Sequence, residues 1–186
     1  CDWVRNGHIA LANTRPHFER LRVLGQWYKQ EFGHETTLVS QADLHSEIGT
    51  GKYYGGLADE ISGGLHPAKY VFGLARAVAQ HGAHLCENTD VTRINRHAGG
   101  FHVHTNRGVL YAREVLVATN GYTDHLVQKL KPRIFSVGSY IIVTEPLSPE
   151  LQERLSPKRR MFYDTKWFLN YFRLTPDGRM LWGGRN

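Results

Sequence analysis

The sequence is poor in cysteine, with two in 186 residues. Two thiols are too few for a disulfide framework or a four-thiolate zinc site, so we expect a reducing, cytoplasmic location. Histidine and cysteine do not recur at metal-ligand spacing, and we predict no metal site. Cys86 has no partner pattern typical of a nucleophile, and we interpret it as a buried structural thiol.

Long apolar runs and concentrated charge are also missing. No apolar stretch reaches the roughly 20 residues that a membrane-spanning helix requires. Apolar residues make up 41% of the chain and charged residues 22%, a balance typical of globular proteins. The net charge is +6, but only residues 158–160 form a basic run. A solvated loop explains that run better than a nucleic-acid site does.

Neither of the common phosphate-binding glycine motifs is present. Gly49 and Gly51 precede Lys52, but a Walker loop would need glycine in place of Ser46 and serine or threonine in place of Tyr53. The spacing of these glycines does not fit a dinucleotide-binding turn either. We interpret the segment as a turn.

Local signals predict a mixed set of helices and strands. Thr14 and Pro16 are typical of a helix start and Gly33 of its end, and Pro67 and Gly82 delimit a second helix. Around these helices we expect short strands at 7–12 and 36–39, a brief helix at 44–48 capped by Ser40, and irregular β-structure at 53–58. After the second helix we expect a meander over 91–112, a buried strand at 114–118, a helix at 122–130, a strand at 134–144 and a strand pair at 168–183.

Five segments together resemble a known family. They are residues 64–70, 91–94, 118–122, 137–146 and 171–185. In this order and spacing they are similar to the FAD-dependent oxidoreductases of the D-amino acid oxidase and glycine oxidase superfamily, and most similar to the gamma-glutamylputrescine oxidoreductase-like branch. The likeness extends over essentially the whole chain.

The resemblance implies an α+β fold that combines part of an α/β FAD-binding sheet with an antiparallel-sheet substrate domain. Residues 1–66 and 124–186 would belong to the substrate domain, and residues 67–123 to the FAD-binding domain. The family's N-terminal Gly-x-Gly-x-x-Gly turn and its C-terminal flavin-contacting segment are not recognised here. We therefore expect an internal piece of a longer flavoenzyme, which by itself oxidises no amine.

The resemblance also assigns residues to FAD and to a substrate. Val91 would contact the adenine region through its backbone, residues 118–121 the diphosphate and ribityl region, and residues 183–185 the isoalloxazine ring. Arg173 would bind a substrate carboxylate, with Tyr171 and Tyr140 as further pocket residues. The predicted cofactor residues are Val91, Ala118, Thr119, Asn120, Gly121, Gly183, Gly184 and Arg185.

The implied reaction is oxidation of a C–N bond in a small amine or amino acid by hydride transfer to flavin N5. Because the flavin supplies this chemistry, we assign no catalytic acid or base. His66 is a candidate base, but it precedes Pro67 and we interpret it as positioning a helix start. Two alternatives remain: a non-enzymatic binding domain on the same scaffold, and a piece of a flavin-dependent tRNA-modifying enzyme. If the protein is an amine or amino acid oxidoreductase, we expect it to have no nucleic-acid partner.

Overall fold

The computed structural model describes residues 1–123 and 125–184. The chain divides into two compact units, and each is described by itself. Unit 1 comprises residues 1–73 and the segment from Ser139 onward, and unit 2 comprises residues 74–138. Along the described residues, no helix combines the length and the apolarity that crossing a membrane requires.

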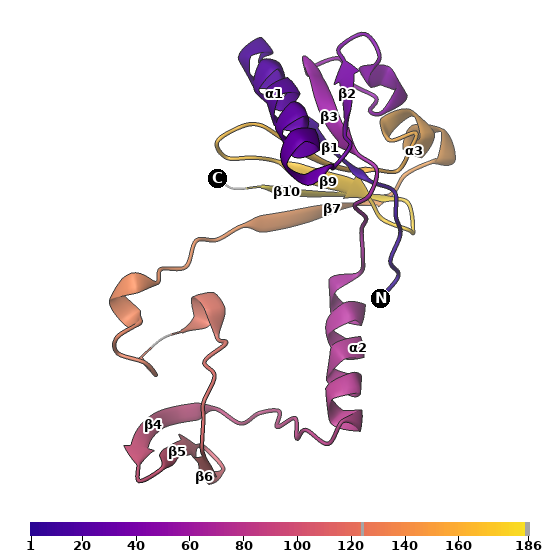
Figure 1. Ribbon diagram of the computed structural model, residues 1–186. Helices are drawn as coiled ribbons and strands as arrows, with labels where there is room; N and C mark the ends of the chain where they lie inside the picture. The colour runs from indigo at the N-terminus through magenta and orange to yellow at the C-terminus, as the bar shows by residue number, and fades with distance from the viewer. Residues whose placement is uncertain (124, 185–186) are drawn as a thin grey trace. The chain divides into compact units, whose positions relative to one another are not determined.

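Unit 1 is built on a seven-stranded mixed sheet (Figure 1). The strand order is β2-β3-β1-β8-β9-β10-β7, and only the β1–β8 pair is parallel. The combination of this sheet with helices confirms the predicted α+β class. The strands are β1 His8–Leu11, β2 Thr37–Ser40, β3 Gly55–Asp59, β7 Tyr140–Pro146, β8 Met161–Asp164, β9 Tyr171–Leu174 and β10 Arg179–Gly184.

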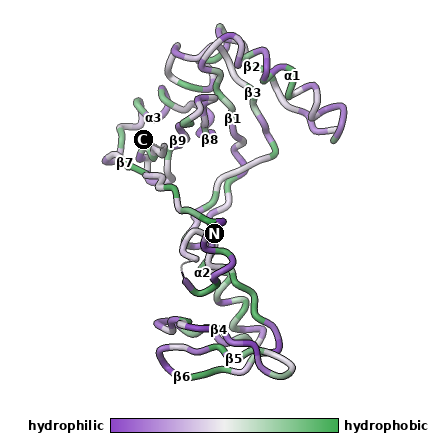
Figure 2. Tube along the Cα trace, turned by 90° about the vertical axis from the view of Figure 1, so that its left-hand side faces the viewer, coloured by the Kyte–Doolittle hydropathy of each residue, from purple (hydrophilic) through white to green (hydrophobic). Residues whose placement is uncertain are grey.

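Helix α1, Arg15–Phe32, covers one face of this sheet (Figure 1). Both of its ends were predicted: the Thr14 hydroxyl accepts a hydrogen bond from the His17 N–H, and Gly33 closes the helix at φ 60°. Leu21 packs against β1 and β3 together with Ala10, Ala12 and Leu57. Hydrophilic and hydrophobic positions alternate along α1 (Figure 2), and Leu21 is its buried residue, whereas Val23, Trp27 and Phe32 are exposed.

The opposite face carries the larger core. Ile9, Leu11, Phe162 and Phe172 are buried there, and Leu44 of the short 3₁₀ helix η1, Leu44–Ser46, joins them. Ser40 caps the turn before η1 rather than η1 itself, whose N-cap is Asp43: the Ser40 hydroxyl accepts the Asp43 N–H at 3.2 Å and donates to the Asp43 carboxylate at 2.6 Å. Helix α3, Pro149–Leu155, and strand β8 were not predicted.

Unit 2 contains a three-stranded antiparallel meander, as predicted. Its strands are β4 Val91–His97, β5 Gly100–Thr105 and β6 Gly108–Ala112. Helix α2, Pro67–Gln80, precedes it and crosses the boundary between the units in the sequence. Gly82, at φ 84°, follows the helix at the predicted stop.

Three predicted elements differ in the structure. Residues 114–118 form no strand, because a strand requires a hydrogen-bonded neighbour and no described strand pairs with them; Leu116 is 91% exposed. The helix expected at 122–130 is replaced, among the described residues, by turns that follow the 3₁₀ helix η2, Asn120–Tyr122. The strand expected from residue 134 begins only at Tyr140, after the 3₁₀ helix η3, Lys131–Arg133.

The expectation of irregular, bulged β-structure at 53–58 holds only for the start of the segment. Tyr53 and Tyr54 form a bend and Gly55 has φ 130°, but strand β3 pairs with β1 on one side and β2 on the other without a bulge. The glycines serve close packing: a Cβ on Gly56 would lie 2.8 Å from both the Ala10 carbonyl oxygen and the Ile9 side chain. Glycine at position 56 therefore allows β3 to lie close to the backbone and side chains of β1.

A buried arginine links the segments of unit 1. Arg160 is 3% exposed, and its Nε donates to Glu47 Oε2 at 2.6 Å. Its Nη1 donates to Glu60 Oε2 at 2.8 Å and to the Asn6 carbonyl oxygen at 3.4 Å. The hydrogen bond from Arg160 holds the pKa of Glu60 below its usual value. The guanidinium thus connects β8, the loop after η1, the end of β3 and the segment before β1.

We predict that Glu47→Gln lowers the free energy of unfolding by about 3 kcal/mol, because it leaves the buried guanidinium of Arg160 under-compensated. Urea unfolding followed by circular dichroism measures the loss. The matched control is Glu19→Gln, which removes the exposed Arg22–Glu19 pair and is expected to cost less than about 0.5 kcal/mol. Equal losses in the two variants would contradict the structural role given to Arg160.

Candidate functional site

Strand alternation in unit 1 places Tyr171 and Arg173 on one face of the sheet. Phe172 and Leu174 are buried on the opposite face, so the two polar residues between them point toward the α1 side. On the neighbouring strand, Phe162 is buried in the same core as Phe172, which leaves Met161 and Tyr163 on the Tyr171 face. We call Met161, Tyr163, Tyr171 and Arg173 the β8–β9 face. Sequence reasoning missed Met161 and Tyr163 because it missed strand β8.

Tyr171 is held in a fixed orientation across the sheet. It lies opposite Gly183 in the β9–β10 register, and its hydroxyl hydrogen-bonds the Ser139 hydroxyl at 3.0 Å. The Ser139 hydroxyl also donates to the Gly184 carbonyl oxygen at 3.3 Å. A Cβ on Gly183 would lie 2.6 Å from the Tyr171 hydroxyl oxygen and closer still to two ring carbons. Glycine at this position therefore makes room for the Tyr171 ring.

Tyr140 does not join this group. It lies opposite Gly184, one residue beyond the Gly183–Tyr171 pair, so the alternation turns its side chain to the other face. There it shares the face of Ile142 and Trp182 and is 71% exposed. The structure thus brings together two of the three predicted substrate residues.

Arg173 reaches across the sheet to the loop before α2. Its Nη2 donates to the Leu65 carbonyl oxygen at 3.1 Å, and a Cβ on Gly64 would lie 2.5 Å from its Nη1. Arg173 is half-buried and lines a cavity of about 690 Å³ in unit 1. No described carboxylate forms an ion pair with it. The guanidinium therefore retains donors for an anion.

His66 lies in the same cavity lining as Arg173, but its ring has a structural role. Its Nδ1 accepts a hydrogen bond from the Lys69 N–H at 3.4 Å, at the start of α2. This agrees with its interpretation as a residue that positions the helix.

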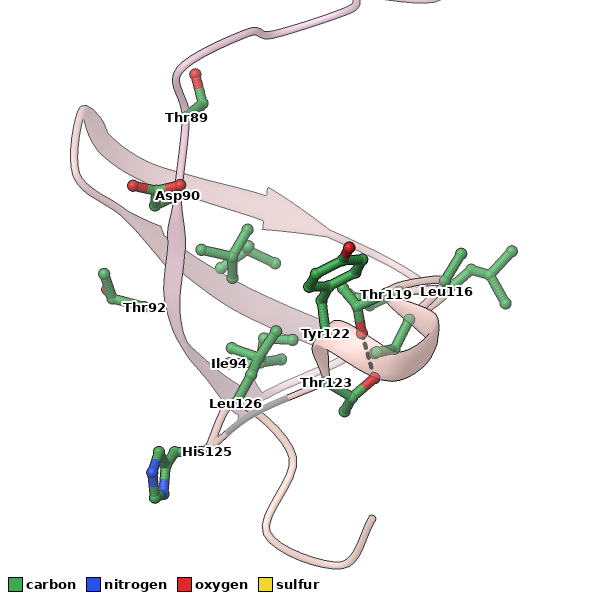
Figure 3. A pocket seen from close by; sticks show the side chains of 15 residues that line it. Thr89, Asp90, Thr92, Ile94, Leu116, Thr119, Tyr122, Thr123, His125 and Leu126 are labelled. Carbon is green, nitrogen blue, oxygen red and sulfur yellow. Dashed lines mark hydrogen bonds between the residues drawn. The ribbon is translucent and has the colours of Figure 1, made fainter. Parts of the chain in front are cut away.

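In unit 2, a second cavity collects three predicted cofactor residues. It measures about 660 Å³, and Val91, Ala118 and Thr119 line it. Thr119 is labelled among the lining side chains in Figure 3. Asn120 and Gly121 lie in η2 directly after Thr119 but do not line the cavity. The predicted cofactor residue Arg185 lies outside the described residues.

The lining of this cavity combines apolar walls with a few oxygen atoms. Ile94 and Leu126 contribute apolar surface, and Asp90 contributes a carboxylate beside β4 (Figure 3). The Asp90 backbone is fixed by Asn106, which donates its backbone N–H to the Asp90 carbonyl oxygen and accepts the Asp90 N–H on its side chain, both at 3.1 Å. Thr119 hydrogen-bonds Thr123 through their hydroxyl groups (Figure 3). Such a lining suits a flat, largely apolar ligand with hydroxyl groups.

Possible metal ligands and free thiols can be located in the part of the chain that the structure describes. It contains no cluster of three His, Cys, Asp or Glu side chains arranged to hold a metal ion. Cys1 and Cys86 are both free and exposed, so the expectation of a buried Cys86 was wrong. Its segment, residues 83–90, forms neither helix nor strand and gives the thiol no core to enter.

Comparison with known proteins identifies relatives along the whole chain. The family described as FAD dependent oxidoreductase (DAO) matches residues 1–186. A probable oxidoreductase OrdL of Haemophilus influenzae is 31% identical over 98% of this chain and 43% of its own length. Gamma-glutamylputrescine oxidoreductase of Escherichia coli is 31% identical over 99% of this chain and 43% of its length.

A solved structure shows the same fold. Glycine oxidase from Geobacillus kaustophilus superposes with a TM-score of 0.78 at 20% identity, covering 98% of this chain and 48% of that one. The chain therefore spans less than half the length of these relatives.

We predict that Gly183→Ala lowers the free energy of unfolding by about 1–3 kcal/mol, because the added methyl group displaces the Tyr171 ring. The test is a double-mutant cycle by urea unfolding, in which Tyr171→Ala removes most of that loss. Gly51→Ala is the matched control, since nothing lies within 4 Å of the new Cβ. If Gly183→Ala lowers the free energy of unfolding by the same amount in the Tyr171→Ala variant, the proposed contact between the Tyr171 ring and Gly183 is refuted.

Proposed function

Because this chain belongs to the family of FAD-dependent oxidoreductases, which it matches over its whole length, we propose that the protein oxidises the C–N bond of a small amine or amino acid. Gamma-glutamylputrescine oxidoreductase among the relatives and glycine oxidase among the structural neighbours support this choice of substrate class. The proposed location is the cytoplasm, where two free, exposed thiols stay reduced.

The observation that carries the proposal is Arg173. A half-buried guanidinium without an ion-pair partner among the described residues is suited to a carboxylate, which it can bind through two parallel hydrogen bonds. Its position next to Tyr171 on the β8–β9 face would place an amino acid across that face. We therefore favour substrates that carry a carboxylate near the amine.

The unit 2 cavity is compatible with part of FAD. Its apolar walls suit the adenine ring, and the carboxylate of Asp90 and the hydroxyl of Thr119 suit ribose hydroxyl groups. We propose that Val91 contacts the adenine region of FAD through its backbone, and that Ala118, Thr119, Asn120 and Gly121 approach the diphosphate and ribityl region. Gly183, Gly184 and Arg185 remain proposed neighbours of the isoalloxazine ring. When bound, FAD supplies the acceptor for a hydride from the C–H group next to nitrogen.

The side chains of this chain then have a positioning role. Arg173 would fix the substrate carboxylate, and Tyr171, held by Ser139, would limit where the rest of the substrate lies. The ring of His66 is engaged at the start of α2, so we assign it no proton transfer. The domain assignment is kept as a proposal: residues 1–66 and 124–186 for the substrate, residues 67–123 for FAD.

We predict that the longest natural form of the protein shows the two flavin absorbance bands between about 300 and 550 nm and oxidises an amine or amino acid. The 186-residue chain alone is expected to be colourless and inactive. A long form that stays colourless after incubation with FAD would contradict the proposed function. Oxidation of an amine by the 186-residue chain alone would contradict the expectation that this activity needs further segments of the protein.

We also predict that Arg173→Met lowers kcat/KM for a carboxylate-bearing substrate by about 10- to 100-fold, because a charge-assisted hydrogen bond is lost. A matching amine without the carboxylate should be oxidised at the original rate, which steady-state assays of both substrates would show. Arg22→Met, at an exposed site on α1, is the control. An equal loss for both substrates would mean that Arg173 supports the fold rather than the carboxylate.

A further inference from the structure

A third cavity lies at one end of the three-stranded meander of unit 2 and is not used by the proposed reaction. It measures about 260 Å³, and its lining is basic, aromatic or glycine: Arg96, His97, Gly99, Gly100, Phe101 and Arg113. None of these residues lines the unit 2 cavity that we propose for FAD. A lining that holds two guanidinium groups and no carboxylate favours an anionic ligand.

The strand order of the meander explains why the basic residues meet. β5 is the central strand, and β4 and β6 both pair antiparallel with it, so both end beside its first residues. Arg96 and His97 are the last two residues of β4, and Arg113 directly follows β6. The turn at residues 98–99 lies at the same end. Arg96 and Arg113 therefore come from strands on opposite sides of β5.

Neither arginine is neutralised within the described part of the chain. Arg96 and Arg113 form no ion pair there, and their guanidinium groups donate no hydrogen bond to a described residue. Glu114 follows Arg113 in the sequence but does not line the cavity. The N–H groups of both side chains are thus available to a ligand.

Ring contacts orient Arg96 and His97. Arg96 Cζ lies over the Phe101 ring, 5.7 Å from its centroid, and the two residues are opposite each other in the β4–β5 register. A guanidinium above a ring keeps the N–H groups at its edge free. The His97 ring is stacked on the His102 ring at a centroid distance of 4.2 Å. One nitrogen of a histidine ring always carries a proton, so His97 can also donate a hydrogen bond.

A backbone N–H in the turn supplies a further donor. The Tyr111 hydroxyl donates to the Ala98 carbonyl oxygen at 3.3 Å, from the face of the sheet opposite to Phe101. In a trans peptide the carbonyl oxygen and the N–H point in opposite directions, so the Gly99 N–H is directed toward the face that carries Arg96 and Phe101. This N–H donates to no group among the described residues.

We propose that this cavity binds a phosphate group, either as inorganic phosphate or as the terminal phosphate of a larger molecule. The guanidinium groups of Arg96 and Arg113 would bind its oxygen atoms from the two sides of β5, and the Gly99 N–H would donate to a further oxygen. A tetrahedral anion can accept hydrogen bonds from these directions at once, whereas a carboxylate has only two oxygen atoms. Because the cavity is separate from the one proposed for FAD, the proposal stands whether or not the protein oxidises amines.

The test is calorimetric titration of the complete protein with sodium phosphate in a phosphate-free buffer at constant ionic strength. We expect saturable binding of phosphate and at least about tenfold weaker binding of acetate, which is an anion with fewer acceptor oxygens. Methyl phosphate distinguishes the two sources of the group. Affinity equal to that of inorganic phosphate supports the terminal phosphate of a larger molecule, and weaker binding supports the free ion.

Arginine variants locate the site on the meander. Arg96→Gln and Arg113→Gln should each weaken phosphate binding about tenfold or more, because a charge-assisted hydrogen bond is lost. Arg107→Gln is the matched control, since it removes the same charge from the β5–β6 turn of the same sheet, outside the cavity lining. All three side chains are exposed, so these variants should keep the fold, which circular dichroism verifies.

Three results would overturn the proposal. They are the absence of saturable phosphate binding, binding of acetate as tight as that of phosphate, and equal losses in Arg107→Gln and Arg113→Gln. The last result would mean that phosphate responds to the overall positive charge of the sheet rather than to this cavity.

Discussion

The fold of unit 1 depends on a buried guanidinium. Arg160 stands at the start of β8, the strand that joins the N-terminal and C-terminal halves of the sheet, and it is neutralised by Glu47 and Glu60. A charge so far from solvent is tolerated only when hydrogen bonds satisfy it. The loop after η1 and the end of β3 must therefore meet β8 in one arrangement. That arrangement sets which side of β8 faces the core and which side carries Tyr163.

Elements with local signals were predictable from the sequence. The ends of α1 are marked by Thr14 and Gly33, and the β4–β6 meander by its turn glycines. Strand β8 was missed because its four residues carry no pattern of their own and pair with β1, far away in the sequence. The apolar run at 114–118 shows the reverse: hydrophobicity alone does not make a strand without a hydrogen-bonded neighbour.

The candidate sites were predictable only in part, because they too depend on the pairing of strands that are far apart in the sequence. Arg173 and Tyr171 could be named from their resemblance to a family, but the separation of Tyr140 from Tyr171 is a matter of one residue of register between β7 and β10. The cavity between α1 and the sheet of unit 1 could not be found from the sequence, because Asp59, Thr36 and Tyr163, which line it, belong to no shared motif.

The parallel pairing of β1 with β8 also has a kinetic consequence. Arg160 and Asn6, hydrogen-bonded beside this pair, are 154 residues apart, and all of unit 2 lies between them in the sequence. Closing so long a loop is entropically costly, and contacts of this separation slow folding. During synthesis, β1, β2, β3 and α1 form an incomplete sheet until β8 has been synthesised. In that interval the edge of β1 is unpaired and can pair with other chains, so we expect the protein to depend most on chaperones then.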